Sequence, residues 1–213
     1  MFLKQNSITS VILAGGNNSR YNGTPKALLE INGKTLYQIT KEKLEKIFES
    51  VILITNNPEI FPDDNCLKFS DIIKNIGPLG GIHSALTNTQ NKEAIFVTAV
   101  DMPFLNEEII KKIVTQYLEN KSDILIPRIK NNIEPLNAIY KTSILSELND
   151  FIKNTKHYAT RDFFSKVNAK YLDFEDSADN LKAFVNVNTP EEFAYFTQNK
   201  NKIVLQRTLR KNH

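Results

Sequence analysis

Two glycine-rich loops contain six of the seven glycines in this sequence, namely Gly15, Gly16, Gly23, Gly77, Gly80 and Gly81. Because glycine has no Cβ, the main-chain N–H groups of such loops can approach phosphate oxygens closely. Arg20 and Lys26 in the first loop add positive charge that would neutralise a polyanion. The pattern indicates a nucleoside triphosphate site. The alternative, a glycine turn beside two surface cations, explains the same residues equally well.

Neither loop matches the two most common nucleotide-binding motifs. The first reads Leu13-Ala-Gly-Gly-Asn-Asn-Ser-Arg20, which is neither the GxxxxGK[ST] of a P-loop nor the GxGxxG of a dinucleotide-binding fold. The second loop precedes a predicted helix, whose N-terminal amides would be available to a ligand. His83 in that helix has no identifiable partner, so we interpret it as structural or solvent-facing.

Two carboxylates follow predicted strands. Asp101 comes directly after the apolar run 94–100, and Asp71 follows the shorter segment 67–70. Side chains at the carboxyl ends of strands in an open α/β sheet reach the crevice where ligands bind. Mg²⁺ takes one or two protein carboxylates together with phosphates and water. Asp101 is therefore the candidate metal ligand, with a turn cap before Pro103 as the structural alternative.

The elements that must position these residues can be read from the apolar pattern. Continuous apolar segments predict buried strands over 8–14, 51–55, 94–100 and 123–127. Between them, apolar residues recur at threes and fours over 36–48 and 109–117, which predicts helices. Asn106 stands where it can cap the second of these. This alternation predicts a three-layer αβα fold with a mainly parallel sheet.

After residue 127 the pattern loosens. Two short strands are expected over 129–140, helices over 142–153 and 160–167, a strand over 184–188, and a last helix begun by Thr189-Pro190. We expect a single domain over 1–200, with a nucleotide-binding part over about 8–127. An acceptor-side part over about 128–199 would form an attached lobe, and a basic tail follows over 200–213.

Composition excludes several classes of protein. The chain has 41% hydrophobic and 24% charged residues, as an ordinary globular protein does. A single cysteine, Cys66, excludes an intrachain disulfide framework, and three isolated histidines do not form a zinc site. No apolar run approaches the roughly 18 residues that cross a bilayer, and no signal peptide is recognisable, so a cytoplasmic protein is expected. Outside the basic tail the chain is slightly acidic, which argues against a nucleic-acid partner.

Four segments occur in an order found in one family: Leu13-Ala-Gly-Gly16, Gly77-Pro-Leu-Gly-Gly81, Asp101-Met-Pro103 and Asn186-Val-Asn-Thr-Pro190. From about Ile8 to Phe196 the chain resembles the molybdenum cofactor guanylyltransferases. The resemblance implies a Rossmann-like nucleotidyltransferase fold and a requirement for Mg²⁺. It implies that GTP reacts with molybdopterin carrying molybdenum to give the guanine dinucleotide cofactor and pyrophosphate. Because this product is labile, molybdoenzyme apoproteins or their chaperones are further expected partners.

The resemblance also assigns roles to individual residues. It places in the nucleotide site Leu13, Ala14, Gly15, Gly16, Lys26, Asn56, Asp71, Gly77, Gly81 and Asp101. The catalytic residues would be Arg20, Lys26 and Asp101, with Asp101 also holding the metal. Acceptor binding would fall to Arg161, Asn186 and Asn188. The asparagine expected near the second strand is either Asn56 or Asn57, and we take Asn56 as the candidate.

Two positions depart from the family pattern. Tyr21 stands where a methionine is usual, and Pro25 stands where an aspartate is common. These changes bear on the choice of base and acceptor. Cytidylyl transfer to the same pterin is therefore the nearest alternative. A sugar-phosphate nucleotidyltransferase and a nucleotide-sensing module without turnover are the others.

Overall fold

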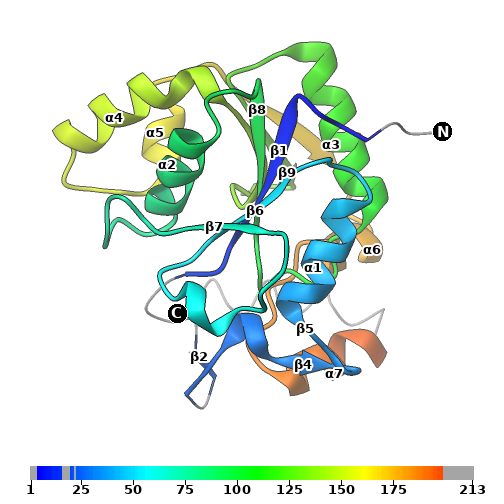
Figure 1. The fold of residues 1–213 in the computed structure, drawn as a ribbon. Coiled ribbons are helices and arrows are strands. Elements are labelled where there is room, and N and C mark those ends of the chain that lie inside the picture. The colour runs from blue at the N-terminus through cyan, green and yellow to red at the C-terminus, as the bar shows by residue number, and fades with distance from the viewer. Residues whose placement is uncertain (1–3, 16–19, 22, 199–213) are drawn as a thin grey trace.

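The computed structural model describes residues 4–15, 20–21 and 23–198, and its centre is an eight-stranded sheet (Figure 1). The strand order is β10-β9-β11-β8-β1-β6-β7, and β12 also pairs with β9. The strands are β1 (Ile8–Leu13), β6 (Val51–Ile54), β7 (Leu67–Phe69), β8 (Ala94–Ala99), β9 (Ile124–Ile129), β10 (Asn132–Ile133), β11 (Asn137–Lys141) and β12 (Ala169–Phe174). Two small hairpins, β2 (Arg20–Tyr21) with β3 (Thr24–Pro25) and β4 (Glu30–Ile31) with β5 (Lys34–Thr35), lie outside it.

The sheet is mainly parallel, as expected. β1 is parallel to both β6 and β8, β7 is parallel to β6, and β12 is parallel to β9. The exceptions are β10, which is antiparallel to β9, and β11, which is antiparallel to β8 on one side and to β9 on the other. The chain reverses after β9 through Lys130, whose φ is 53°. A strand that follows such a reversal must run antiparallel to the one before it.

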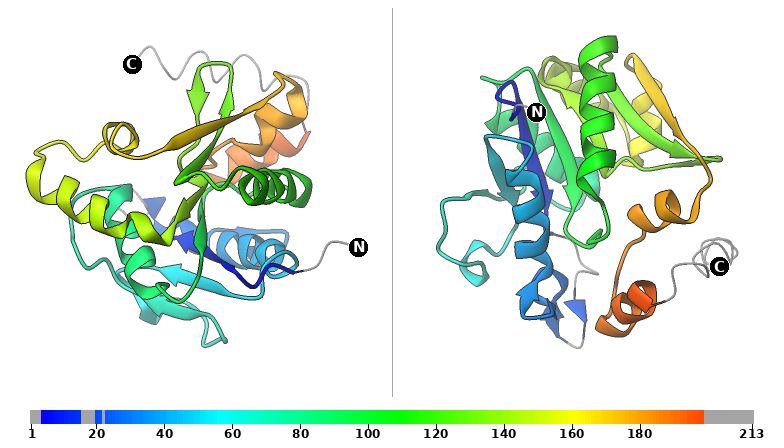
Figure 2. Two further views of the ribbon diagram at one scale, coloured as in Figure 1. Left: turned by 90° about the horizontal axis from the view of Figure 1, so that it is seen from above. Right: turned by 90° about the vertical axis from the view of Figure 1, so that its right-hand side faces the viewer.

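Helices cover both faces of the sheet, which confirms the three-layer prediction. Figure 2 shows α2 (Pro78–Asn88), α4 (Leu145–Asn154) and α5 (Thr160–Phe164) on one face. On the other face lie α1 (Leu36–Glu45), α3 (Glu107–Asn120) and α6 (Ala178–Ala183). Each face has its own apolar cluster, because alternate residues of β1 point to opposite sides: Ile8 and Ile12 to one and Val11 to the other. None of the described helices is both long and apolar enough to cross a bilayer.

Two expectations for the second half of the chain were wrong. Residues 128–198 do not form an attached lobe, because β11 lies between β8 and β9 within the common sheet. Residues 184–188 are not a sheet strand but an extended connection between α6 and α7 (Pro190–Gln198). The apolar alternation there has another cause, since Phe184, Val185 and Val187 are all buried in the core cluster of α1 and α3. The last helix begins at Pro190, as expected.

Local signals explain where several elements begin. The Asn106 side chain accepts a hydrogen bond from Ile109 N at 2.9 Å, so it caps α3 as predicted. Thr35 and Gln38 form a reciprocal capping box at the start of α1. Between β4 and β5, Asn32 and Gly33 both have positive φ, which is the geometry of a two-residue hairpin turn.

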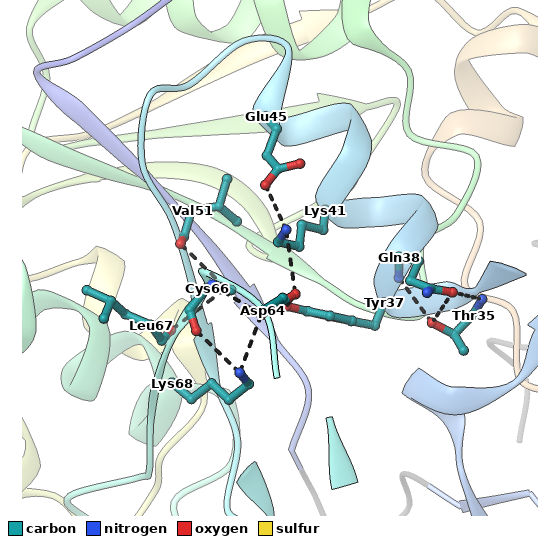
Figure 3. A network of polar contacts seen from close by, with 10 residues as sticks. All are labelled: Thr35, Tyr37, Gln38, Lys41, Glu45, Val51, Asp64, Cys66, Leu67 and Lys68. Atoms are coloured by element: carbon teal, nitrogen blue, oxygen red, sulfur yellow. Dashed lines mark hydrogen bonds and ion pairs between the residues drawn. The ribbon is translucent and has the colours of Figure 1, made fainter. Parts of the chain in front are cut away.

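One polar network attaches the loop before β7 to α1 (Figure 3). At its centre is Asp64, which accepts hydrogen bonds from the Tyr37 hydroxyl at 2.9 Å and from Cys66 N at 3.1 Å. The ammonium groups of Lys41 and Lys68 lie 3.5 and 3.3 Å from its carboxylate. Burial alone would raise the pKa of Asp64, but these donors and charges bring it below its ordinary value. The ionised form of Asp64 is therefore favoured by folding.

We expect Asp64→Asn to lower the free energy of unfolding at neutral pH by about 1–3 kcal/mol, because it removes a charged acceptor from several donors. A carboxyl whose pKa is lowered by folding contributes stability above its unfolded pKa and loses it as the pH falls through the folded value. The difference from the parent protein should therefore shrink in acid. Urea denaturation at pH 7 and below pH 4 measures this. Asp63→Asn, at an exposed neighbouring residue, is the control, and an equal effect of the two substitutions would contradict the assignment.

Candidate active site

Three predicted site residues follow the carboxyl ends of adjacent parallel strands. Leu13 at the end of β1 is in register with Ile54 of β6 and Ala99 of β8. Main-chain hydrogen bonds extend this alignment, from Ala14 N to Ile54 O at 2.9 Å and from Val100 N to Leu13 O at 3.1 Å. The segments that carry Gly15, Asn56 and Asp101 therefore leave the sheet at one edge, where open α/β sheets bind their ligands.

On the β6 side of this edge, Asn56 and Asp71 are paired. Asn56 Nδ2 donates to Asp71 Oδ2 at 2.8 Å, and Asp71 N donates to Asn56 Oδ1 at 3.1 Å. Gly15 lies against the same amide, since a Cβ at Gly15 would lie 3.9 Å from Asn56 Nδ2. Of the two asparagines considered from the sequence, the structure thus brings Asn56 to the glycine loop, whereas Asn57 begins the 3₁₀ turn Pro58–Ile60.

The second glycine loop forms the start of α2 and packs closely against its surroundings. Gly77 precedes the helix with a φ of 62°, a conformation that side chains other than glycine rarely adopt. A Cβ at Gly80 would lie 2.7 Å from Ile73 O, and a Cβ at Gly81 would lie 2.9 Å from the Leu13 side chain. These glycines let the first turn of α2 lie directly beside β1 and the Asp71 loop.

A second group of site residues surrounds Asp101. Lys26 opens the 3₁₀ turn Lys26–Leu28, and its ammonium lies 3.9 Å from Asp101 Oδ2. The same ammonium donates to Asn188 Oδ1 at 2.6 Å. Val187 N donates to the main-chain oxygen of Asp101 at 2.7 Å, which attaches the segment before α7 to the end of β8. The structure therefore brings Lys26, Asp101 and Asn188 together, and their roles in a reaction centre stay predictions.

Asp101 is a carboxylate largely withdrawn from water, with 20% of its side chain exposed. Burial raises its pKa above the ordinary value, and the positive charge of Lys26 counters part of that rise. Within the described residues, its carboxylate accepts no hydrogen bond from another side chain. Carboxylate oxygens of this kind are ligands that a hard cation such as Mg²⁺ prefers.

The described residues fit a cation held mainly by substrate. They contain no group of three or more His, Cys, Asp and Glu side chains gathered as a metal cluster. An ion beside Asp101 would thus draw its other ligands from phosphates and water. This is how Mg²⁺ is usually bound in phosphate-handling sites.

Three contacts behind Asp101 were not predicted from the sequence. Lys43 of α1 donates its ammonium to Pro103 O, and Asn137 of β11 accepts from Thr98 Oγ1 at 2.8 Å and donates toward Met102 Sδ at 2.7 Å. Together they attach α1 and β11 to the end of β8 and the turn that carries Asp101. Lys43 lies on a helix with a regular amphipathic pattern, and nothing in the sequence distinguished it from the other helical lysines.

Other predicted residues lie elsewhere or outside the described part of the chain. Gly16 and the Arg20 side chain lie outside it. Arg161 is exposed on α5, which lies on the sheet face opposite α6, the helix that leads into the Asn186–Asn188 segment (Figure 2). Asn186 is also exposed, at the start of that segment. His83 is buried, and its Nε2 lies 2.9 Å from Asn149 Oδ1 of α4, in keeping with the structural interpretation.

Comparison with known families matches residues 10–170 to the MobA-like NTP transferase domain. The chain belongs to this family. A relative from Peptoclostridium acidaminophilum, described as a probable molybdenum cofactor guanylyltransferase, is 35% identical over 201 residues, covering 89% of this chain and 88% of that protein. A molybdenum cofactor guanylyltransferase from Vibrio parahaemolyticus is 32% identical, covering 88% and 94%. The resemblance seen in the sequence motifs is thereby confirmed.

A solved structure supports the fold of this MobA-like transferase. The molybdopterin-guanine dinucleotide biosynthesis protein A of Archaeoglobus fulgidus superposes with a TM-score of 0.71. The two chains are 24% identical, and the match covers 87% of this chain and 95% of the other. The nucleotidyltransferase fold expected from the sequence is confirmed.

A pair of glycine substitutions separates packing from ligand approach in this MobA-like site. We expect Gly80→Ala to lower the free energy of unfolding by about 1–3 kcal/mol, because its methyl group would press on the main chain at Ile73. Gly15→Ala meets only ordinary contacts, so its stability should hardly change while its affinity for GTP falls. Urea denaturation and calorimetric titration measure the two effects. Equal stability of both variants would contradict the packing argument.

Removing the charge of Asp101 should abolish activity without lowering the stability of the protein at pH 7. A carboxyl whose pKa is raised by folding stabilises the protein only below its unfolded pKa and loses that contribution as the pH rises. We therefore expect Asp101→Asn to be at least as stable as the parent protein at pH 7, with no advantage below about pH 4. Magnesium-dependent nucleotidyl transfer should be abolished. Thermal denaturation and a pyrophosphate-release assay test this, and a folded variant that works at full rate would remove Asp101 from the site.

Proposed function

We propose that this protein transfers GMP from GTP to molybdopterin carrying molybdenum, forming the guanine dinucleotide cofactor and pyrophosphate. The observation that carries the proposal is the Lys26–Asp101–Asn188 group beside the glycine loops, in a chain that matches named guanylyltransferases over nearly its full length. Asn188 belongs to the segment assigned to the acceptor, and Lys26 belongs to the nucleotide loop. The contact between them supports a centre at which two phosphorylated substrates meet.

The transfer is a single in-line displacement at the α-phosphorus of GTP. An oxygen of the terminal phosphate of molybdopterin forms the new P–O bond, and the bond to the bridging oxygen of the β-phosphate breaks, with its electron pair leaving on pyrophosphate. The attacking phosphate is already ionised, so no general base is required. The protein must align two polyanions and stabilise the charge that develops on the phosphate oxygens.

The residues divide this work between them. The amides of the first glycine loop and of the first turn of α2 would bind the triphosphate, with Asn56 and Asp71 forming the adjacent wall. Lys26 would neutralise charge at the α-phosphate, and Arg20 would add a second cation. Asp101 would hold Mg²⁺, which when bound offsets charge on the reacting phosphates. Asn186, Asn188 and Arg161 stay as the proposed acceptor contacts, although Arg161 would have to be reached across the sheet.

We further propose a cytoplasmic location, in which the finished cofactor passes directly to molybdoenzyme apoproteins or their chaperones. The buried free thiol of Cys66 is compatible with a reducing compartment.

The decisive experiment supplies Mg²⁺, molybdopterin carrying molybdenum, and GTP, CTP or ATP in separate reactions, and identifies the dinucleotide by mass. We expect the guanine dinucleotide together with equimolar pyrophosphate. A cytosine dinucleotide would favour the related cytidylyltransferase activity. Nucleotide binding without pyrophosphate release would indicate a sensing module, and turnover of hexose 1-phosphates would indicate a sugar nucleotidyltransferase.

Lys26→Ala should lower kcat/KM for GTP by roughly 10²- to 10³-fold, the loss typical of removing one preorganised charge-stabilising donor. Steady-state kinetics with saturating acceptor measure this. Lys34→Ala, which removes an exposed lysine paired with Glu42 on the surface, is the control and should leave the rate unchanged. An unaltered kcat/KM in Lys26→Ala would exclude this lysine from the mechanism.

A further inference from the structure

A chain of contacts leads from the first turn of α7 to the reaction centre. The carboxylate of Glu192 accepts hydrogen bonds from Asn188 N at 2.8 Å and from Asn188 Nδ2 at 3.2 Å, both through Oε2. Asn188 Oδ1 in turn accepts from the Lys26 ammonium at 2.6 Å. Lys26 lies 3.9 Å from Asp101. Glu192 is thus connected to the candidate metal ligand through two intervening residues, Asn188 and Lys26, without lying beside it.

Glu192 decides which end of the Asn188 side chain faces Lys26. An asparagine amide has an oxygen that accepts hydrogen bonds and a nitrogen that donates them, and the two are exchanged by rotation about the last side-chain bond. Because Glu192 can only accept when ionised, it selects the orientation in which Nδ2 points toward itself. The oxygen is then left to face the ammonium of Lys26. In the opposite orientation two donors would face each other.

The ordinary role for a glutamate at this position is to stabilise the start of a helix. Thr189 Oγ1 accepts from Glu192 N at 3.0 Å, which is half of a capping box. In a complete capping box the glutamate side chain returns to the N–H of the capping residue, here Thr189. Glu192 reaches one residue further back, to Asn188. The hydrogen bonds from Asn188 to Glu192 therefore connect α7 to the group formed by Lys26, Asp101 and Asn188.

We propose that Glu192 is a positioning residue for nucleotidyl transfer: it orients the Asn188 amide, and through it places the Lys26 ammonium beside Asp101. The inference rests on the proposed function for its kinetic consequences. The orientation of Asn188 itself does not depend on which substrates the protein uses.

Two conservative substitutions distinguish this role from helix stabilisation. Glu192→Gln keeps the length of the side chain and an acceptor oxygen but loses the charge. Glu192→Asp keeps the negative charge near the N-terminus of α7, which suits the helix dipole, but its carboxylate is one methylene too short to reach Asn188. If Glu192 acts by positioning Asn188, Glu192→Gln should keep more activity than Glu192→Asp. If it acts only by stabilising the helix, Glu192→Asp should keep more activity.

We expect Glu192→Asp to lose roughly ten- to a hundredfold in kcat/KM for the acceptor, the effect of a lost hydrogen bond to a charged group, and Glu192→Gln to lose less than about fivefold. The KM for GTP should change less than the kcat. Glu108→Asp and Glu108→Gln, at an exposed acid in the first turn of α3, are matched controls and should leave both constants unchanged. The reverse order of the two Glu192 variants would overturn the proposal.

A double-mutant cycle with Asn188→Ala tests whether Glu192 acts through Asn188. In the Asn188→Ala background, Glu192→Asp should reduce kcat/KM by no more than about twofold, because the group that it positions is already missing. An undiminished effect would show that Glu192 acts by another route and would also overturn the proposal.

A measurement without substrates keeps this test separate from the proposed function. The Asn188 side-chain amide can be observed by ¹H–¹⁵N NMR and assigned by its disappearance in Asn188→Ala. We expect its signals to move toward those of a solvent-exposed amide in Glu192→Asp and to change little in Glu192→Gln. Unmoved signals in Glu192→Asp would refute the positioning role, whereas a protein that passes this test but transfers nothing to molybdopterin would refute only the proposed function.

Discussion

A carboxylate withdrawn from water at the end of β8 constrains how the rest of the chain is arranged. Burying an ionised group costs free energy unless opposite charge or hydrogen bonds compensate it. Asp101 has a lysine 3.9 Å away, and its pKa is nevertheless raised because burial outweighs that partner. Folding therefore disfavours the ionised form of Asp101, and further positive charge nearby would lower that cost.

The residues around Asp101 come from distant parts of the sequence. Lys26 and Asn188 are 162 residues apart, yet they are joined by a hydrogen bond beside Asp101. Central strands make the arrangement possible, because β1 and β8 are buried on both faces and leave the position of their ends little freedom. The connection before α7 is attached to the same strand end, since Val187 N donates to the main-chain oxygen of Asp101 at 2.7 Å.

Much of this could be predicted from the sequence, and what failed has physical causes. Strands buried on both faces appear as unbroken apolar runs, so β1, β6, β8 and β9 were found within a residue or two. Asn106 was recognised because caps depend on local chemistry. Strand order is a tertiary property, which is why the central place of β11 was not foreseen. Residues 184–188 alternate because the core buries one side of an extended chain, and alternation alone cannot distinguish this from sheet pairing.

For the site residues, too, local motifs could be recognised from the sequence, whereas contacts that depend on the fold could not. Motif order singled out Lys26, Asp101 and Asn188 as candidates, since each lies in a distinctive segment, and the fold brings these three together. The choice between Asn56 and Asn57 required the position of Asp71, and the contribution of Lys43 required the packing of α1 against the turn after β8. For Glu192 a signal was present, because a threonine followed three residues later by a glutamate marks a helix start. Its reach to Asn188 depends on the extended connection before α7, which only the fold defines.

The insertion of β11 beside β8 has a consequence for how the chain is made. Before residues 137–141 are synthesised, the edge of β8 that faces away from β1 has no partner strand. Its main-chain donors and acceptors can then pair with a strand of another chain, which is a route to aggregation. A fragment ending near residue 128 would therefore contain every glycine of both loops but would expose the unpaired edge of β8 and be prone to aggregate. The part of the chain that holds both glycine loops therefore depends on the later strand β11 to cover this edge.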